Sequence, residues 1–271
     1  MITEEILEAA AELFSMNYGV WGPLAAEKMR VRQGVRVRMS PKRLANKIIP
    51  PASASASGTE NIYIRLLIDE SIVANVFATR WERDGGKVLW ITQLCVHRGF
   101  RNMGFAKRLL ECLKRDEEEG EEAGMMGMMG WVPRVGILSS HPFAILAVVR
   151  VFGRGGVGGA GREDGDLNID FDLGMTKRYA RAMMDSCPVE YVKGAALRGS
   201  LFKSDGDGDG DGDGDGDGDG DGDGDGSISC ASTQFWVDHQ EPLEALRIVQ
   251  EKGIVWPFGE LPDGCEFSVL Q

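Results

Sequence analysis

The sequence predicts a single domain of mixed α/β (α+β) class, in which helices cover both faces of a mostly antiparallel central sheet. Three runs rich in β-branched residues follow one another at 62–68, 72–81 and 88–96, and short polar turns separate them. Segments with helical periodicity precede and follow these runs. Hydrophobic residues make up 43% of the 271 residues, which is enough for a core of this size.

The N-terminal region predicts two helices. Residues 3–15 are amphipathic, and a second helix is expected to begin at Ser40-Pro41, an N-cap followed by a first-turn proline. Lys28–Lys47 carries eight basic residues and no acidic one. This run is either a solvated helix face or a surface that attracts an anionic partner. Residues 50–58 have the composition of a loop.

Seven further elements are expected after the three strands. They are helices at 105–114, 142–152, 176–184 and 242–252, and strands at 135–139, 234–239 and 266–270. The acidic and then Gly/Met-rich stretch at 116–130 has the composition of a loop.

The net charge of −12 is concentrated in one tract. Residues 205–226 are eleven Asp-Gly pairs, which hold eleven of the 42 acidic residues and leave 31 acidic residues against 30 basic ones. Such a tract buries no apolar surface, so residues 204–227 are predicted to be a disordered insert. The negative net charge of the whole chain therefore does not exclude an anionic ligand that binds outside this tract.

Composition also limits the compartment and the cofactor. The five cysteines form no CxxC pair, and the three histidines show no zinc-ligand spacing. No apolar run reaches the ~18 residues of a membrane helix. We expect a soluble protein with no metal, no membrane and no nucleic-acid partner. A cytoplasmic location is expected, and the nucleus stays open.

The segment 94–107 contains the clearest candidate for a ligand-binding site. A strand is expected to end at Val96, a basic turn follows, and a helix begins near Gly104. The unpaired N–H groups at a helix start bind anions, and a glycine there lets a phosphate approach the backbone closely. The segment therefore predicts a pyrophosphate-binding turn. The alternative is a basic loop before a surface helix.

The same residues carry a family resemblance. Arg101-x-x-Gly104-x-Ala106 resembles the R/Q-x-x-G-x-G/A motif of the GNAT-superfamily N-acetyltransferases. Residues 92–96 resemble the fourth strand of that family, and residues 136–142 resemble the fifth strand and its exit. The likeness is best over residues 62–153. It implies a sheet splayed between the fourth and fifth strands, and transfer of an acetyl group from acetyl-CoA directly to a primary amine.

The resemblance also implies a set of cofactor-binding residues. These are Leu94, Cys95, Val96, Arg101, Asn102, Met103, Gly104, Phe105, Ala106 and Lys107. Main-chain N–H groups near Cys95 and Val96 would polarise the thioester carbonyl. Because the amine attacks directly in this family, Cys95 is expected to be a strand residue and not a nucleophile.

One departure from the family leaves other hypotheses open. Many members place a tyrosine in the helix after the fifth strand as general acid, and residues 144–150 contain none. A CoA-binding protein without catalysis is therefore one alternative. A second alternative is a non-enzymatic interaction module, whose insert and basic face recruit partners. His141 is either the catalytic base or a structural cap.

Other candidates also carry two interpretations. Tyr18 and Trp21 either line the acceptor site or pack in the core. Asp238 and His239 favour a strand-end turn and helix cap over a site. Gly153–Gly158 spells GxGxxG, but it follows a helix and opens none, so nucleotide binding is not expected. The Asp-Gly tract lacks the twelfth-position glutamate of a calcium loop, which is Gly216 here.

Overall fold

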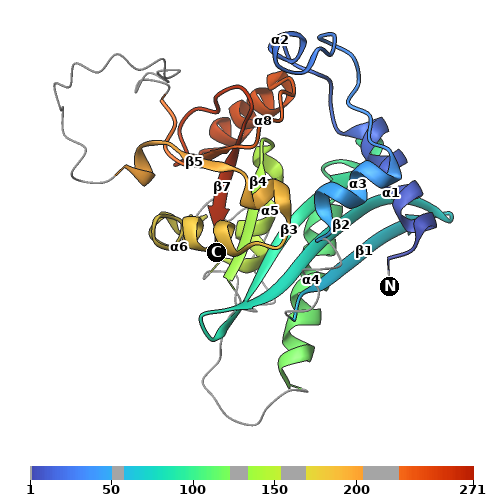
Figure 1. Cartoon of the computed structure of the whole chain (residues 1–271), viewed down its shortest axis with the longest axis vertical. Helices are drawn as coiled ribbons and strands as arrows, with labels where there is room; N and C mark the ends of the chain where they lie inside the picture. Colours follow the sequence, from blue (N-terminus) through green and yellow to red (C-terminus); the bar gives the residue numbers. More distant parts are fainter. Residues whose placement is uncertain (1, 51–57, 123–133, 154–168, 204–225) are drawn as a thin grey trace.

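The computed structural model describes residues 2–50, 58–122, 134–153, 169–203 and 226–271, and the side chains up to residue 117 in the second of these ranges (Figure 1). Residues 204–225 of the predicted insert and the last five residues of the GxGxxG stretch lie outside these residues. The predicted end of the insert at residue 227 was wrong, because Ser227 is buried and forms a bridge with Gly259. None of the helices among the described residues is both long and apolar enough to cross a bilayer.

The described strands form one seven-stranded mixed sheet, in the order β1-β2-β3-β4-β7-β6-β5. All neighbouring strands are antiparallel except β3 and β4, which run parallel. The coarse fold class is therefore confirmed. The strands are β1 (Glu60–Ile68), β2 (Ser71–Arg83), β3 (Gly86–Val96), β4 (Arg134–Ser139), β5 (Ala196–Arg198), β6 (Cys230–Ser232) and β7 (Cys265–Leu270).

The predicted meander of the first three strands is confirmed. Its second turn consists of Asp84 and Gly85, which both adopt positive φ angles, 51° and 73°. Two such residues in succession match the right-handed twist of a hairpin, and Asp-Gly is a favoured pair for that turn. The local sequence was sufficient here because each strand pairs with the next one along the chain.

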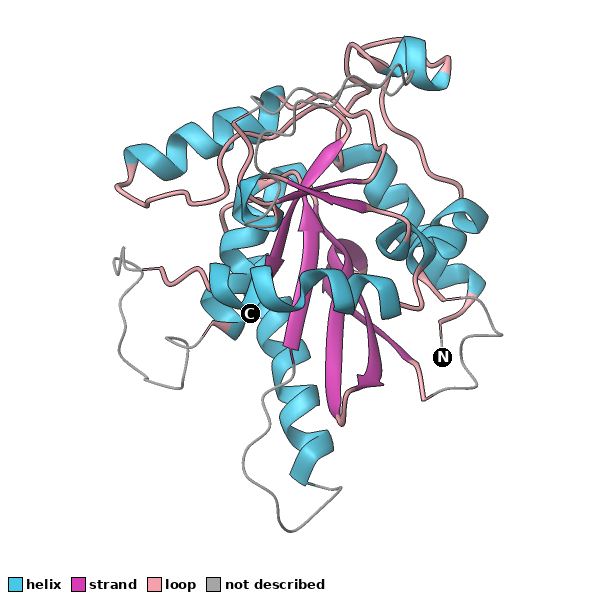
Figure 2. Cartoon of the chain, turned by 60° about the vertical axis from the view of Figure 1, so that its left-hand side comes forward, coloured by secondary structure: helices cyan, strands magenta, loops and turns pink. Residues whose placement is uncertain are grey.

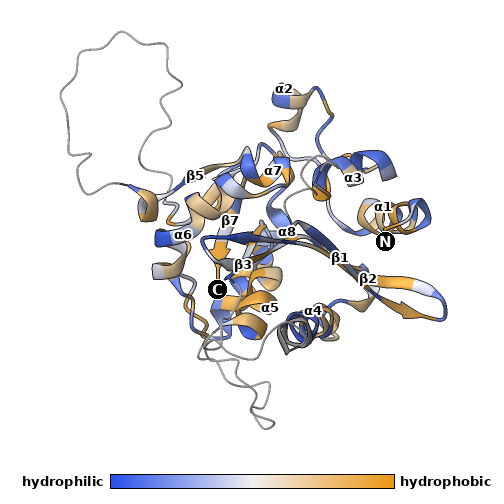
Figure 3. Cartoon of the chain, turned by 60° about the horizontal axis from the view of Figure 1, so that its bottom comes forward, coloured by the Kyte–Doolittle hydropathy of each residue, from blue (hydrophilic) through white to orange (hydrophobic). Residues whose placement is uncertain are grey.

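Eight α-helices lie among the described residues, and most of them cover the two faces of the sheet (Figures 2 and 3). Figure 3 shows α4 and α5 on one face, and α1, α3 and α7 on the other. The helices are α1 (Glu4–Asn17), α2 (Ala25–Met29), α3 (Pro41–Ile48), α4 (Phe105–Glu122), α5 (Pro142–Phe152), α6 (Leu173–Ser186), α7 (Glu190–Lys193) and α8 (Gln240–Glu251).

The core divides along the same two faces. The larger cluster packs β2, β3, β4 and β7 against α4 and α5. A second cluster joins Trp90 of β3 and Leu270 of β7 to α6 and α7, and a third joins Phe77 of β2 to α1 and α3. We refer below to the α4/α5 face and the α1/α7 face.

Two element predictions were wrong. The helix predicted for 105–114 continues through the acidic stretch to Glu122, and buried Glu117 within it pairs with Arg80 of β2 at 2.6 Å. Residues 234–239 form no strand, because Gln234 adopts a φ of 55° and the segment makes only an isolated bridge from Val237 to Trp21. The neighbouring strand is instead β6, at 230–232.

Strands β3 and β4 pair over only part of their lengths. The ladder joins Val88–Ile91 to Arg134–Ile137, and β3 then runs on to Val96 without a paired β4 residue. On its other side β4 pairs with β7 as far as Ser139. The sheet therefore has an unpaired stretch between its two central strands, at the ends where both strands exit toward helices.

Candidate functional site

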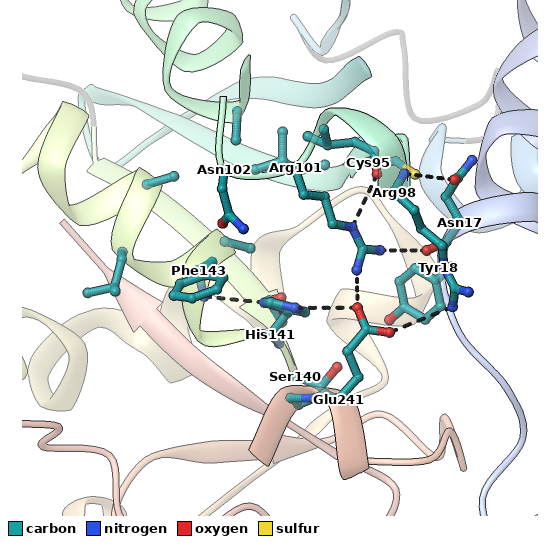
Figure 4. Close-up of a pocket in the computed structure, with 18 of the residues that line it drawn as sticks. Asn17, Tyr18, Cys95, Arg98, Arg101, Asn102, Ser140, His141, Phe143 and Glu241 are labelled. Atoms are coloured by element: carbon teal, nitrogen blue, oxygen red, sulfur yellow. Dashed lines mark hydrogen bonds and ion pairs between the residues drawn. The ribbon is translucent and has the colours of Figure 1, made fainter. Parts of the chain in front are cut away.

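A cavity of about 570 Å³ lies where β3 and β4 stop pairing (Figure 4). Its walls come from the end of α1, the turn between β3 and α4, one side of α5, both ends of α8, and the ends of β3 and β4. Residues Leu94, Cys95 and Val96 of β3 line it, as do Ser139 and Ser140 at the end of β4. The cavity thus reaches into the unpaired stretch of the sheet.

The turn before α4 is shaped by two residues in left-handed conformations. Asn102 has a φ of 63° and Gly104 a φ of 76°. The first helical hydrogen bond runs from the Arg108 N–H to the Gly104 carbonyl, at 3.0 Å. The N–H groups of the three residues between them therefore precede that bond, and all three residues line the cavity. The structure therefore has the helix start that the sequence predicts after β3, with three N–H groups ahead of the first helical hydrogen bond. That these groups bind an anion stays a prediction.

A network of charged side chains crosses the cavity (Figure 4). The Arg101 guanidinium donates to the Asn17 carbonyl at 2.6 Å and forms an ion pair with Glu241 of α8. The second carboxylate oxygen of Glu241 lies 3.7 Å from Arg98, and its first lies 3.9 Å from Nε2 of His141. Glu241 therefore neutralises part of the positive charge of this wall.

His141 occupies the N-cap of α5. Its Nδ1 accepts a hydrogen bond from the Phe143 N–H at 3.3 Å. Burial, with nearby Arg101, lowers the pKa of His141 to about 4, and Glu241 only partly opposes this effect. The imidazole is therefore neutral at pH 7, with its proton on Nε2. A lone pair committed to the cap does not accept a substrate proton, so this geometry favours the structural alternative.

Cys95 and Tyr18 lie at the inner end of the cavity. Burial raises the pKa of the Cys95 thiol to about 12, and its Sγ lies 3.9 Å from the Leu13 carbonyl. The Tyr18 ring stacks on Phe14 at 4.3 Å. Burial raises the pKa of Tyr18 well above its ordinary value, and the Ser140 side chain opposes this rise. Both groups are therefore protonated at neutral pH.

Of the ten residues predicted to bind the cofactor, nine line the cavity. The exception is Met103, whose side chain is 55% exposed. Tyr18 lines the cavity too. Trp21 does not, because it is buried against Phe235 at 5.6 Å. Asp238 accepts a hydrogen bond from the Gln240 N–H at the start of α8, as expected for a turn.

Two acidic residues were missed by sequence reasoning. Glu241 follows no recognisable pattern, and its partners come from distant segments. Glu266 had a signal, since it is the one charged residue within the apolar strand β7. It is 7% exposed, and burial raises its pKa to about 7 while the Thr233 hydroxyl opposes the rise.

Comparison with known proteins assigns the chain to no family. No protein-family model, curated protein or solved structure matched the chain. Within the described ranges, no group of three or more His, Cys, Asp or Glu residues is placed to hold a metal ion.

Proposed function

We propose that the protein is an acetyl-CoA-dependent N-acetyltransferase that acts on a primary amine. One observation carries the proposal. The basic turn before α4 and the unpaired ends of β3 and β4 line the same cavity. An anion-binding turn alone is common, but here it opens into a slot between two strands that run parallel. This arrangement supports the splayed strands that the GNAT resemblance implies.

The turn would hold the pyrophosphate of the cofactor. The N–H groups at the start of α4 are preorganised for an anion by the helix dipole and by Gly104. Arg98 and Lys107 add positive charge on the same wall. An added Cβ at Gly104 would meet no atom within 4 Å, so the space beside this residue is open.

The slot between the strands would hold the pantetheine and the thioester. Beyond Ile91, β3 has no paired β4 residue, so its N–H groups on that side have no acceptor on β4. The carbonyls of Thr92 and Val96 accept hydrogen bonds from the Tyr191 hydroxyl and the Arg101 side chain. An N–H group near Cys95 and Val96 would donate to the thioester oxygen, where negative charge develops during attack.

The chemistry needs no covalent enzyme intermediate. The amine nitrogen attacks the thioester carbon, a C–N bond forms, and the C–S bond breaks to release the CoA thiolate, which takes up a proton. Cys95 is unsuited as a nucleophile because its thiol is protonated at neutral pH. Tyr18 is the cavity phenol that could donate the proton to sulfur, in place of the tyrosine that α5 lacks.

A second candidate is a CoA-binding protein without catalysis. It is favoured by the cavity face of α5, where Ala144, Ala147 and Arg150 supply no hydroxyl group. In this case the same turn binds CoA, but no amine is acetylated.

Calorimetry with acetyl-CoA tests the binding step. Gly104 and Gly85 form a matched pair, because both adopt positive φ angles and a Cβ at either meets no atom within 4 Å. Gly104→Leu and Gly85→Leu therefore introduce similar backbone strain, but only the first places a side chain on the cavity wall. We expect the wild type and Gly85→Leu to bind acetyl-CoA alike, and Gly104→Leu to bind at least ~30-fold more weakly. Equal binding by both variants, or none by the wild type, would contradict the proposal.

A further inference from the structure

The buried carboxylate of Glu266 lies beyond the inner end of the cavity, on the α1/α7 face of the sheet. Phe267 pairs with Ser139, so Glu266 follows at the level of Ser140, which lines the cavity. Side chains alternate along a strand, and Phe267 packs on the α4/α5 face. Glu266 therefore points to the opposite face.

Two tyrosines interact with this carboxylate. Tyr18, at the end of α1, and Tyr191, on α7, are both buried, and the negative charge of Glu266 raises the pKa of each phenol further. Tyr191 donates to the Thr92 carbonyl at 3.0 Å, which ties α7 to the unpaired part of β3. Tyr18 belongs to both sites, because it also lines the cavity.

Among the described residues, Glu266 has no positively charged partner. No Lys, Arg or His nitrogen of the described residues lies within 4.0 Å of its carboxylate. The titratable groups of the packed elements that act on the two phenols are Cys95 of β3 and Cys187, which follows α6. Neither is cationic.

An unpaired acceptor lies on the same face. Gln93 of β3 pairs with Phe77, whose ring packs toward α1 and α3, so the two side chains share that face. Gln93 is 8% exposed, and its buried Oε1 has no hydrogen-bond partner. A buried acceptor without a donor is costly, as is a buried carboxylate without a cation. A ligand that brings both a positive charge and N–H donors would relieve both costs.

We propose that Glu266, with Tyr18 and Tyr191, forms the pocket for the ammonium group of the acceptor amine. The binding part of this inference stands on the residues above, and its catalytic part rests on the proposed acetyltransferase function. Glu266 takes one proton from the ammonium nitrogen, and the freed lone pair attacks the thioester. Tyr18 donates its proton to the departing thiolate and takes up the second proton that the nitrogen loses. Glu266 then returns its proton to solvent.

The same residues define the chemical class of the acceptor. The wall around Tyr18 is aromatic and apolar, with Phe14 and Phe235 against the ring. A carboxylate next to the ammonium group would meet Glu266, and no cation of the described residues lies beside Glu266 to balance the two negative charges. The pocket therefore favours alkyl or arylalkyl amines over α-amino acids.

Binding of amines in the absence of acetyl-CoA tests this proposal on the full chain. The probes are phenethylamine, n-butylamine and spermidine, with phenethyl alcohol and L-phenylalanine as matched compounds. The variant is Glu266→Gln, which keeps the shape and removes the charge, and the control is Glu260→Gln, an exposed glutamate in the same C-terminal segment. Circular dichroism checks that each variant is folded.

We expect phenethylamine to bind the wild type and Glu260→Gln at pH 8, and to bind Glu266→Gln at least ~10-fold more weakly. Phenethyl alcohol and L-phenylalanine should bind all three proteins at least ~10-fold more weakly than phenethylamine binds the wild type. The affinity of the wild type for phenethylamine should rise between pH 6 and pH 8, as the carboxyl group ionises.

The outcomes separate this inference from the proposed function. If acetyl-CoA binds but the affinity for amines is the same in Glu266→Gln, or if none of the three amines binds the wild type, the pocket is overturned and the acetyltransferase proposal stands. If amine binding depends on Glu266 but acetyl-CoA does not bind, the pocket stands and the acetyltransferase proposal fails.

Discussion

Two regions handle charge in opposite ways: the turn at the outer end of the cavity, and the buried space beyond its inner end. We refer to them below as the two ends. At the turn before α4, Arg98 and Arg101 are balanced by Glu241, which forms ion pairs with both. Beyond the inner end, Glu266 is buried without a cation among the described residues, and its charge raises the pKa of the Tyr18 and Tyr191 phenols. The first end holds its charge in pairs close to solvent, and the second holds one charge away from solvent.

This difference indicates the charge of the ligand that each end can bind. Paired surface charges contribute little to stability and can exchange partners, so an anionic ligand can replace Glu241 at the turn. A buried unpaired carboxylate destabilises the free protein until a cation or a proton arrives. The two ends are thus complementary to the two reactants of an acetyl transfer, a polyanionic cofactor and a cationic amine.

The largest expected effect is on stability at the inner end. Because the pKa of Glu266 is raised from its ordinary value to about 7 in the folded protein, the folded state favours the protonated acid. This cost is absent below the ordinary pKa, grows as the pH rises, and is complete above pH 7. Glu266→Gln should therefore be more stable than the wild type at pH 8, by up to about 3 kcal/mol, and nearly equal to it at pH 4.5. Urea denaturation at the two pH values measures this.

The matched control for that experiment is Glu260→Gln, which should follow the wild type at both pH values. Equal stability of Glu266→Gln and the wild type at pH 8 would mean that Glu266 has a compensating partner, and the contrast between the two ends would disappear.

The next effect concerns Arg101 at the outer end. Arg101→Ala removes the ion pair with Glu241 and the hydrogen bond to the Asn17 carbonyl, and it leaves a carboxylate facing the incoming phosphates. Acetyl-CoA affinity should fall at least ~10-fold, an effect of about 1.4 kcal/mol or more. Glu241→Gln should have the opposite sign, because it frees two guanidinium groups. Calorimetry measures the acetyl-CoA affinity of both variants. Weaker binding by Glu241→Gln than by the wild type would contradict the account.

His141 lies between the two ends, and its expected effect is confined to low pH. Its pKa of about 4 in the folded protein means that the unfolded chain gains protons first as the pH falls. Above the ordinary pKa of histidine, His141 costs the folded state nothing by its titration. As the pH falls toward 4, the unfolded chain is increasingly favoured and the free energy of unfolding decreases. His141→Asn keeps an N-cap acceptor without that titration, so at pH 5 it should be more stable than the wild type, by on the order of 1–2 kcal/mol.

The same variant also tests the catalytic alternative for His141. Thermal denaturation at pH 5 and pH 8 gives the stability comparison, and thiol release from acetyl-CoA gives the activity. Activity within about threefold of the wild type at pH 8 supports a cap. A loss of 100-fold or more, the scale of general-base catalysis, would restore the histidine as the base.

The smallest effect is expected from Tyr191→Phe. The change removes the hydroxyl that donates to the Thr92 carbonyl, at a cost of about 1 kcal/mol in unfolding free energy. Tyr179→Phe on α6 is the matched control and should change stability less. Because the proposed ammonium site includes Tyr191, the loss of its hydroxyl should weaken phenethylamine binding as well. A change in stability without a change in amine binding would limit Tyr191 to a structural role.

The parts predicted from sequence are those fixed by nearby residues. The meander follows from strands that pair with their neighbours, and the turn at Arg101–Ala106 follows from a strand, a glycine and a helix in close succession. Glu241 was missed because its partner Arg101 is 140 residues away. Glu266 was placed in a strand, but its environment comes from α1 and α7, and no local pattern reports that. The helical 116–122 segment was missed because a tertiary partner, Arg80, stabilises Glu117 within it.

The most direct test of the central claim is release of free CoA thiol from acetyl-CoA, measured with a panel of small amines, polyamines and peptides. The proposal predicts amine-dependent release by the wild type, recovery of the N-acetylated amine by mass spectrometry, and loss of both in Gly104→Leu but not in Gly85→Leu. Acetyl-CoA binding without amine-dependent release would leave a CoA-binding protein. Release that is equal in both glycine variants would contradict the assignment of this cavity as the site of transfer.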